Sequence, residues 1–461
     1  MSDDVAVDSA RDAVGPRVQP HILTNPSPDE TYTLTASIEG VNDAIWAALP
    51  DITLKMATTQ TPQPSRARRP AEWIDHLAHA TIPSRGPSLT QVGSVLFAST
   101  GTQTDRVLRP IWEALGKVVR QPRSVLLPGL SPRRVAAASM VASRSVRELR
   151  SWCMRAGLPE PPELASEVYK AEIYRLRAES LALTGNGVTT LVVATQHNSI
   201  TRSITRALAS NGISTCYVPH APVANNPWYR DLPVHYALLR GPAEVDFYSN
   251  LGAISSGRLL VVGQPGTERA ATPRADTADH IVYAASDQNP ERLMSDVAVI
   301  QHAVDRPVEV CLHPRSDPST CDLFPPGWTV HPPGSAMRVI RKRGAHALIQ
   351  HSSGVGLEAM KAGLDVIDLC PAGHLPNYPY IAPPHVQIVH NSRELRSALD
   401  AVSHRKENAA DRASYADQWT TMWDSDATAA AIAALLRISA TPTASTLLLD
   451  SWPMRRQPNN G

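Results

Sequence analysis

Short apolar runs alternate with amphipathic stretches along most of this chain, and that alternation predicts parallel β-strands covered by helices. In the first half the clearest run is 189–195, which ends at Gln196-His197-Asn198 and leads into a helical stretch over about 200–210. A segment rich in Gly, Pro and Thr follows at 263–274, and the pattern then restarts with an apolar run at 280–286. We therefore expect an α/β protein with two doubly wound units that face a cleft.

The predicted organisation follows from the length of 461 residues, which suffices for two ordinary domains and tails. Both ends and an internal stretch are polar and without periodicity, which is typical of segments that do not bury a core. The predicted segments are a tail at 1–30, a first unit at 31–265 with a linker or loop at 58–70, a second unit at 266–440, and a tail at 441–461.

The most informative segment is AHALIQHSSGVGLEAMKAGLDVIDLC, which reads as strand, glycine turn, helix and strand. Gly354 and Gly356 would let a phosphate approach the start of the helix without a Cβ in the way. Glu358 would then accept hydrogen bonds from ribose hydroxyls, so the segment predicts a nucleotide site. The alternatives are that Ser352 and Ser353 serve as N-caps and that the small residues serve packing.

Composition excludes several classes of protein. The formal net charge of +1 gives no global argument for a nucleic-acid partner. No apolar run approaches the roughly 20 residues of a membrane span, and the N-terminus is acidic, so we expect a cytoplasmic protein. The five cysteines include no Cys-x-x-Cys pair, and no metal-ligand spacing stands at a strand end. Neither a metal nor a cofactor is predicted.

One segment is strongly basic, although the chain as a whole is close to neutral. Residues 66–155 contain 15 Lys and Arg but 5 Asp and Glu. Such a region is suited to an anionic acceptor, such as a lipid-diphosphate-linked glycan, or to peripheral contact with the anionic inner membrane face. The alternative is a solvated arginine-rich surface.

The motifs resemble those of glycosyltransferases with two Rossmann domains (the GT-B fold), within them bacterial sialyltransferases, polysialyltransferases and capsule-polymer transferases. The matching residues are Leu312-His313-Pro314-Arg315 and His351-Ser352-Ser353-Gly354. The stretch from Tyr217 to Gly252, with its His220-Ala221 pair at a strand end, is similar to the corresponding connection in capsule and glycerophosphate transferases. The resemblance covers about 185–400.

This resemblance implies transfer of a sugar or sugar-like unit from a nucleotide donor, CMP- or UDP-linked, to a hydroxyl on a glycan or lipid-linked acceptor. Because no metal-ligand spacing stands at a strand end, we expect this transfer to be metal-independent. The expected setting is surface glycan or polysaccharide synthesis. The first half would hold the acceptor and the second half the donor. His313, Ser352 and Ser353 would contact the donor phosphate, and Arg315 beside them can pair with phosphate in fork geometry.

The sequence does not identify the catalytic base, because the first half contains no Asp/Glu-Asp/Glu-Gly motif of the kind that supplies the base in the sialyltransferase branch. An inverting transfer needs a group that removes the acceptor proton. His220 and His197 are the candidates, with Asp231 and Glu244 behind them, whereas a retaining enzyme would need none. The other hypotheses are a nucleotide-sugar 2-epimerase and a non-catalytic nucleotide-sugar-binding scaffold.

Overall fold

The computed structural model describes two stretches of the chain, 43–58 and 79–441. Within the second stretch the exceptions are 156, 158–159, 162, 226–231, 252–253, 255, 268–279, 287–289, 315, 344 and 404–408. The predicted tail at 1–30, nearly all of the 58–70 loop and nearly all of the 441–461 tail lie outside the described residues.

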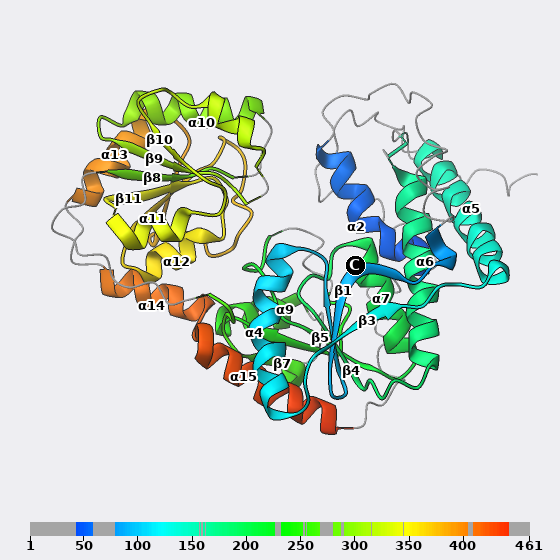
Figure 1. The fold of residues 1–461 in the computed structure, drawn as a ribbon. Helices are drawn as coiled ribbons and strands as arrows, with labels where there is room; N and C mark the ends of the chain where they lie inside the picture. Colours follow the sequence, from blue (N-terminus) through cyan, green and yellow to red (C-terminus); the bar gives the residue numbers. More distant parts are fainter. Residues whose placement is uncertain are drawn as a thin grey trace, which may run out of the picture.

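Two separate β-sheets, each flanked by helices, form the molecule (Figure 1), so the predicted α/β architecture is confirmed. The first sheet has seven strands, all parallel except β1. In spatial order they are β3 (Arg123–Leu127), β1 (Ser84–Val92), β2 (Val95–Ser99), β4 (Thr190–Val193), β5 (Ser214–Tyr217), β6 (Tyr236–Leu239) and β7 (Leu259–Val261).

The second sheet is parallel throughout. Numbered along the chain its order is 3-2-1-4-5-6, which is that of dinucleotide-binding Rossmann sheets. Such a sheet binds ligands where its order reverses, and here that point lies between β8 and β11. The strands in spatial order are β10 (Thr329–His331), β9 (Val308–Cys311), β8 (Ile281–Ala284), β11 (Ala347–Gln350), β12 (Asp365–Leu369) and β13 (Val386–Val389).

Helices cover both faces of both sheets, as short fully buried strands require. On the first sheet, α4 (Thr102–Val118) and α15 (Asp424–Ala440) pack on one face, and α6 (Leu164–Leu183), α7 (Ser199–Ser210) and α9 (Pro242–Leu251) on the other. On the second sheet, α10 (Pro290–Ala303) and α13 (Ser392–Ser403) pack opposite α11 (Ala336–Arg343) and α12 (Val355–Lys361). The remaining elements are α2 (Asp43–Thr58), α5 (Pro132–Arg155), α14 (Ala409–Trp419), and the 3₁₀ turns η1 (His79–Thr81), η2 (Ser256–Arg258) and η4 (Pro318–Leu323).

The end of the described chain returns from the second sheet to the first. Helix α14 packs against α12 of the second unit, and α15 then packs along α4 of the first unit (Figure 1). The hydroxyls of Thr190 in β4 and Ser439 in α15 lie 2.9 Å apart, and Gln264 forms a parallel bridge with Trp423. The last helix therefore belongs to the first unit by its contacts, although its residues fall in the 266–440 range.

Strand β1 was not expected from the sequence. Its residues, SRGPSLTQV, contain a glycine and a proline and show little alternation, so they carry a weak strand signal. The strand forms because it is half of an antiparallel hairpin with β2, in which Val92 pairs with Val95 and Gly93 takes a φ of 58° in the turn. Between Ser84 and Leu89 its pairing with β3 shifts register.

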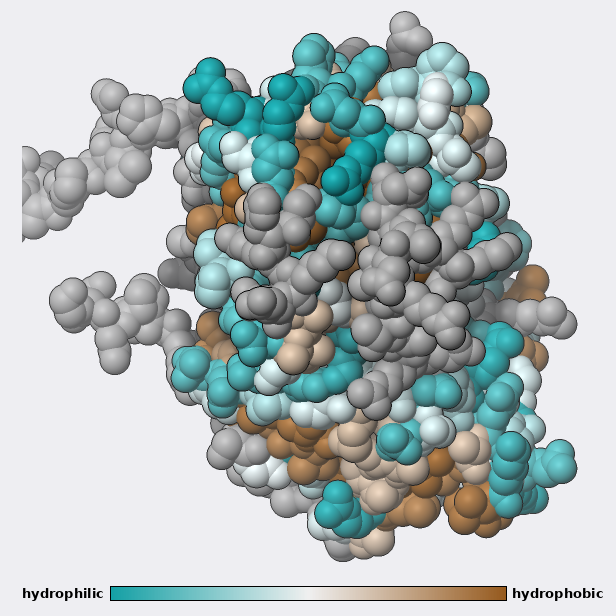
Figure 2. Space-filling view, turned by 90° about the vertical axis from the view of Figure 1, so that its left-hand side faces the viewer, coloured by the Kyte–Doolittle hydropathy of each residue, from teal (hydrophilic) through white to brown (hydrophobic). Residues whose placement is uncertain are grey.

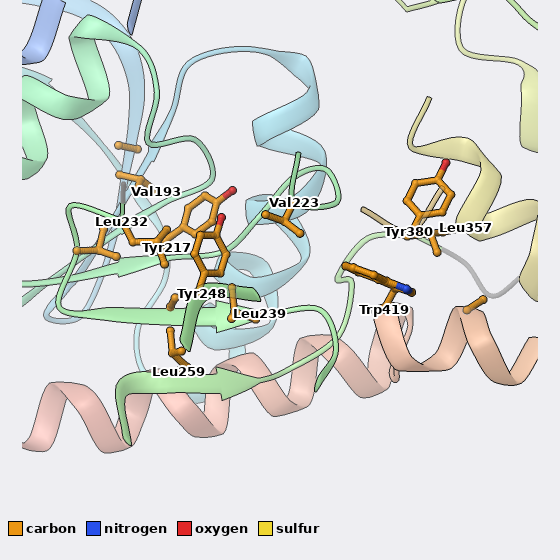
Figure 3. Close-up of a cluster of buried hydrophobic side chains, with 14 of the residues drawn as sticks. Val193, Tyr217, Val223, Leu232, Leu239, Tyr248, Leu259, Leu357, Tyr380 and Trp419 are labelled. Carbon is orange, nitrogen blue, oxygen red and sulfur yellow. The ribbon is translucent and has the colours of Figure 1, made fainter. Parts of the chain in front are cut away.

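The hydrophobic core runs from one unit into the other. Figure 3 shows Tyr217 and Tyr248 of the first unit with Val223, Trp419 and Tyr380 in the same cluster of buried side chains. Figure 2 shows one outer face, which is mostly hydrophilic above and gathers hydrophobic residues below. Within the described part of the chain, no helix combines the length and the apolar character needed to cross a membrane.

Candidate functional site

Three neighbouring strands of the second sheet end at the same level. Ala284, the last residue of β8, pairs with Cys311 of β9 and with Gln350 of β11. The segments that follow β9 and β11 therefore begin side by side at the carboxyl edge, next to the point where the strand order reverses. These segments carry His313 and the His351–Gly354 segment, which we call the serine turn.

The backbone of the serine turn is strained. Ser352 has a φ of 43°, in the left-handed region that side chains other than glycine rarely adopt. Two contacts hold it there: the Ser352 N–H donates to Asp368 Oδ1 at 2.8 Å, and the Asn377 N–H donates to Ser352 Oγ at 3.2 Å. Strain of this kind is frequent at ligand sites, where the surrounding structure over-determines the conformation.

Both serine hydroxyls accept hydrogen bonds from the backbone. Ser353 Oγ accepts from the N–H of Val355 at 3.4 Å, and the carbonyl of Ser353 accepts from Tyr380 Oη. Because a hydroxyl has one hydrogen and two lone pairs, accepting a bond leaves that hydrogen available for a ligand oxygen. A Cβ on Gly356 would lie 2.6 Å from both Gln350 Oε1 and Tyr380 Oη, so packing alone demands glycine there.

His313 lies half-buried two residues past β9, and its carbonyl accepts from the N–H of Ser316 at 2.9 Å. Arg315 lies outside the described residues. Of the predicted donor-binding residues, the structure thus brings His313 and the serine turn to one edge of the sheet.

A buried polar group beneath the serine turn was missed by the sequence reasoning. Asp368 Oδ1 also accepts from Gln350 Nε2 at 3.1 Å, while its Oδ2 is buried with no hydrogen-bond partner. Burial raises the pKa of Asp368 to about 6, and Asp296 adds to the rise, against the Ser352 N–H, Gln350 and Arg292. The signal was present, since Asp368 is a carboxylate at the carboxyl end of an apolar strand.

The first sheet brings His197 and His220 together. Their rings stack with centroids 6.3 Å apart, after β4 and β5 respectively. His220 Nδ1 lies 2.6 Å from the carbonyl oxygen of Ala194, so Nδ1 carries the proton and donates. In the neutral ring, Nε2 is then the nitrogen with the lone pair. His197 Nδ1 lies 3.2 Å from the Thr195 hydroxyl.

The loop that carries His220 contacts the serine turn of the other unit. A Cβ on Gly354 would lie 2.9 Å from Pro222 Cδ, which is closer than real Cβ contacts come. The N–H of Asn225 also donates to the carbonyl of Asn377, the residue whose own N–H bonds Ser352. We call this contact, between His220–Asn225 and the serine turn with Asn377, the junction.

Two buried charged residues, Glu244 in α9 and Arg240 just after β6, lie behind the junction. Glu244 is 1% exposed, and its carboxylate accepts from the N–H groups of Val223 and Arg240, each at 3.0 Å. Burial raises the pKa of Glu244, whereas Arg240 and these hydrogen bonds lower it. This carboxylate thus fixes the loop rather than reaching an acceptor, and Asp231, the other carboxylate considered, lies outside the described residues.

Glu358 of the second unit interacts with the buried Arg240 of the first unit. Burial lowers the pKa of Arg240, and the carboxylates of Glu244 and Glu358 raise it. Arg240 is 2% exposed and follows the apolar run of β6, which is the signal by which the sequence could have revealed it. A half-buried carboxylate on α12 therefore balances an arginine from the other unit.

No metal site stands beside these residues: the described part of the chain holds no group of three or more His, Cys, Asp or Glu side chains that could bind an ion. An apolar cavity of about 300 Å³, lined by residues that include Leu181, Val188 and Leu208, lies at the opposite end of β4 from His197.

No protein-family model and no curated protein sequence matches this chain. Solved structures that resemble it include UDP-GlcNAc 2-epimerase from Methanocaldococcus jannaschii, crystallised with UDP-GlcNAc and UDP, at 15% identity over 62% of this chain and 87% of that one, with a TM-score of 0.43. The glycosyltransferase of kitacinnamycin is 12% identical over 66% and 95% of the two chains, with a TM-score of 0.39. A spinosyn rhamnosyltransferase bound to spinosyn aglycone is 13% identical over 66% and 96%, with a TM-score of 0.38. At these scores the likenesses do not establish a family.

Proposed function

We propose that this protein is a glycosyltransferase that moves a sugar or sugar-like unit from a nucleotide-activated donor to a hydroxyl acceptor. The observation that carries this proposal is the junction, where the loop bearing His220 meets the serine turn at the carboxyl ends of parallel strands from the two sheets. Open α/β sheets bind ligands at those ends. One partner is assigned to each sheet, with the donor on the second and the acceptor on the first.

The donor assignment rests on the second sheet's strand order and on the chemistry of its edge. Ser352 and Ser353 can each donate a hydroxyl hydrogen, and His313 stands on the adjacent strand end. These donors suit the oxygens of a phosphate or diphosphate. Glu358, in the first turn of α12, is assigned to the ribose hydroxyls, and we propose a CMP- or UDP-linked donor.

The acceptor assignment rests on the orientation of His220. Because its Nδ1 donates to the carbonyl of Ala194, Nε2 is the basic nitrogen and can take the proton of the attacking hydroxyl. The acceptor oxygen then forms a bond to the anomeric carbon of the donor sugar. At the same time the bond between that carbon and the donor phosphate oxygen breaks, and the nucleotide leaves with the electron pair. The serine turn and His313 stabilise the charge that grows on the departing phosphate, so this chemistry requires no metal.

The acceptor and setting are proposed more broadly. We propose a glycan or lipid-linked acceptor in surface glycan or polysaccharide synthesis, with the protein in the cytoplasm. The support is that the donor assignment leaves the first unit, with its basic 66–155 segment, for the acceptor.

Calorimetric titration with CMP, CDP, UDP and GDP tests the donor site, with Glu358→Gln as the variant. Loss of charge-assisted hydrogen bonds to ribose should weaken binding of the best nucleotide by about 10- to 150-fold. Glu113→Gln, at an exposed carboxylate of α4, is the matched control and should bind as wild type. Equal affinity for all three proteins would remove Glu358 from the site.

Incubation with the matching sugar nucleotide tests the reaction. Release of nucleotide with transfer to an added hydroxyl acceptor, or with slow hydrolysis, is the expected outcome. Formation of an isomeric sugar nucleotide would instead indicate an epimerase. Binding without any turnover of the donor, with every acceptor tried, would indicate a scaffold.

A further inference from the structure

Helix α5 has one buried side and one exposed side. The buried residues pack against α6 and α2. In Figure 1 the helix forms the right-hand border of the molecule, on the far side from the second sheet. The buried residues are Ala138, Ala142, Ser145, Val146, Leu149, Trp152 and Cys153.

The exposed side of α5 carries arginines and methionines in one stripe. With 100° between successive residues, the six positions of this stripe fall within a sector of about 100° around the helix. Two of them, Met140 and Met154, are 70% and 77% exposed, among the most exposed large apolar side chains in the described part of the chain. We name this stripe the α5 outer face, which consists of Arg133, Met140, Arg144, Arg147, Met154 and Arg155.

The charge of this face is almost entirely positive. Helix α5 contains six arginines and one acidic residue. That residue, Glu148, lies at the border of the stripe and pairs with Arg144 at 2.8 Å. Arg133 and Arg147 are exposed and make no ion pair with any described residue. The face thus presents positive charge and exposed apolar side chains together.

A further exposed apolar residue stands beside the start of the helix. Ile82 is 57% exposed and follows η1. The η1 segment is attached to the residues that lead into α5, because the N–H of Leu130 donates to the carbonyl of Ala80 at 2.8 Å. Apolar side chains are therefore exposed near the start of α5, in its middle and at its end.

We propose that the α5 outer face binds the surface of a membrane that contains anionic phospholipids. Arginine guanidinium groups pair with lipid phosphates, and their aliphatic stems and the methionine chains enter the boundary between headgroups and acyl chains. A nucleic acid would account for the arginines but would leave Met140 and Met154 exposed to water. An anionic membrane surface accounts for both, because its phosphates pair with the arginines and its apolar layer accepts the methionines.

This inference does not depend on the proposed reaction. It does refine that reaction if both hold, because a membrane-bound first unit would meet a lipid-linked acceptor at the surface where such acceptors are held.

The test is co-sedimentation of the full-length protein with vesicles, without any nucleotide. Wild type should bind vesicles of phosphatidylcholine with phosphatidylglycerol, bind more weakly as salt rises, and fail to bind pure phosphatidylcholine. The variant Arg133→Gln/Arg147→Gln/Arg155→Gln should bind the anionic vesicles roughly 100-fold more weakly. The matched control is Arg338→Gln/Arg393→Gln/Arg437→Gln, at three exposed arginines of α11, α13 and α15.

A second variant tests the apolar part. Met140→Ser/Met154→Ser should bind the anionic vesicles about tenfold more weakly than wild type, because two side chains no longer enter the lipid. Thermal unfolding of every variant verifies that the fold is retained. Equal binding by the arginine variant and its control, or binding to a duplex nucleic acid but not to vesicles, would overturn the proposal, and unchanged binding by the methionine variant would contradict the insertion.

Discussion

Pro222 of the first unit occupies the space into which a side chain on Gly354 of the second unit would project. The two residues belong to loops that follow β5 and β11, and a Cβ on Gly354 would come within 2.9 Å of Pro222 Cδ. The glycine is thus required at this position by a close approach between the two units.

Gly354→Ala should therefore separate the His220 loop from the serine turn. We expect a fall in turnover of about tenfold or more at saturating donor, since displacement of a catalytic group by a fraction of an ångström is costly, with a smaller change in donor affinity. Gly327→Ala, where a Cβ meets nothing within 4 Å, is the control. Addition of Pro222→Ala should recover part of the activity, because Ala has no Cδ, and a double variant as impaired as Gly354→Ala would contradict this explanation.

His220→Ala should lower turnover by about 10²- to 10⁴-fold, the usual contribution of a general base, with donor affinity little changed. The residual activity should lose the acidic limb of the pH–rate profile, because the group that must be deprotonated is gone. His302→Ala, on the exposed side of α10, should behave as wild type. If His197→Ala proves the more damaging variant, the base has been assigned to the wrong ring of the stacked pair.

His313→Ala should reduce turnover more than it reduces donor binding, because charge on the leaving phosphate grows in the transition state. Removal of one such hydrogen-bond donor costs about 10²- to 10³-fold in rate. Single-turnover kinetics and calorimetry separate the two effects. A proportionate loss in both would show ground-state binding, and full activity would make His313 a structural turn residue.

Asp368 should make folding stability depend on pH. Its pKa in the folded protein, about 6, lies above the ordinary 3.8, so between these values the folded chain holds a proton that the unfolded chain has released. The stability contributed by this group is therefore greatest at low pH and falls as pH rises through the window. As pH rises from 4 to 7, the free energy of unfolding of wild type should therefore fall by about 1–3 kcal/mol relative to that of Asp368→Asn.

Denaturant unfolding at several pH values measures this difference. Asp400→Asn, at an exposed carboxylate of α13, is the control and should follow wild type. Parallel curves for wild type and Asp368→Asn would mean that the Asp368 carboxyl ionises normally in the folded protein.

Activity should persist in excess EDTA. The proposed donor phosphates meet the serine hydroxyls and His313, and the described residues include no metal-binding group. Stimulation by added magnesium would still be compatible, because divalent ions can help nucleotide product leave. Complete loss in EDTA that one metal restores would contradict metal-independent chemistry.

The sequence by itself determined most elements of the second unit and the position of its edge residues, although it did not reveal β10 or α11. Its apolar runs are short and buried on both faces, and each ends at a turn, so periodicity and local turn chemistry predicted β8, β9 and β11 and the serine turn between β11 and α12. Local signals suffice here because each element forms from residues that adjoin in the chain.

Only the tertiary structure decided which distant residues meet. The fit of Pro222 to Gly354, the burial of Asp368 beneath Ser352 and the return of α15 to the first sheet join residues far apart in the chain. Strand β1 likewise forms because β2 and β3 pair with it, although its own residues have only a weak propensity for β-structure. Such contacts depend on how whole elements dock, and the free energy of docking comes from surfaces that no single segment contains.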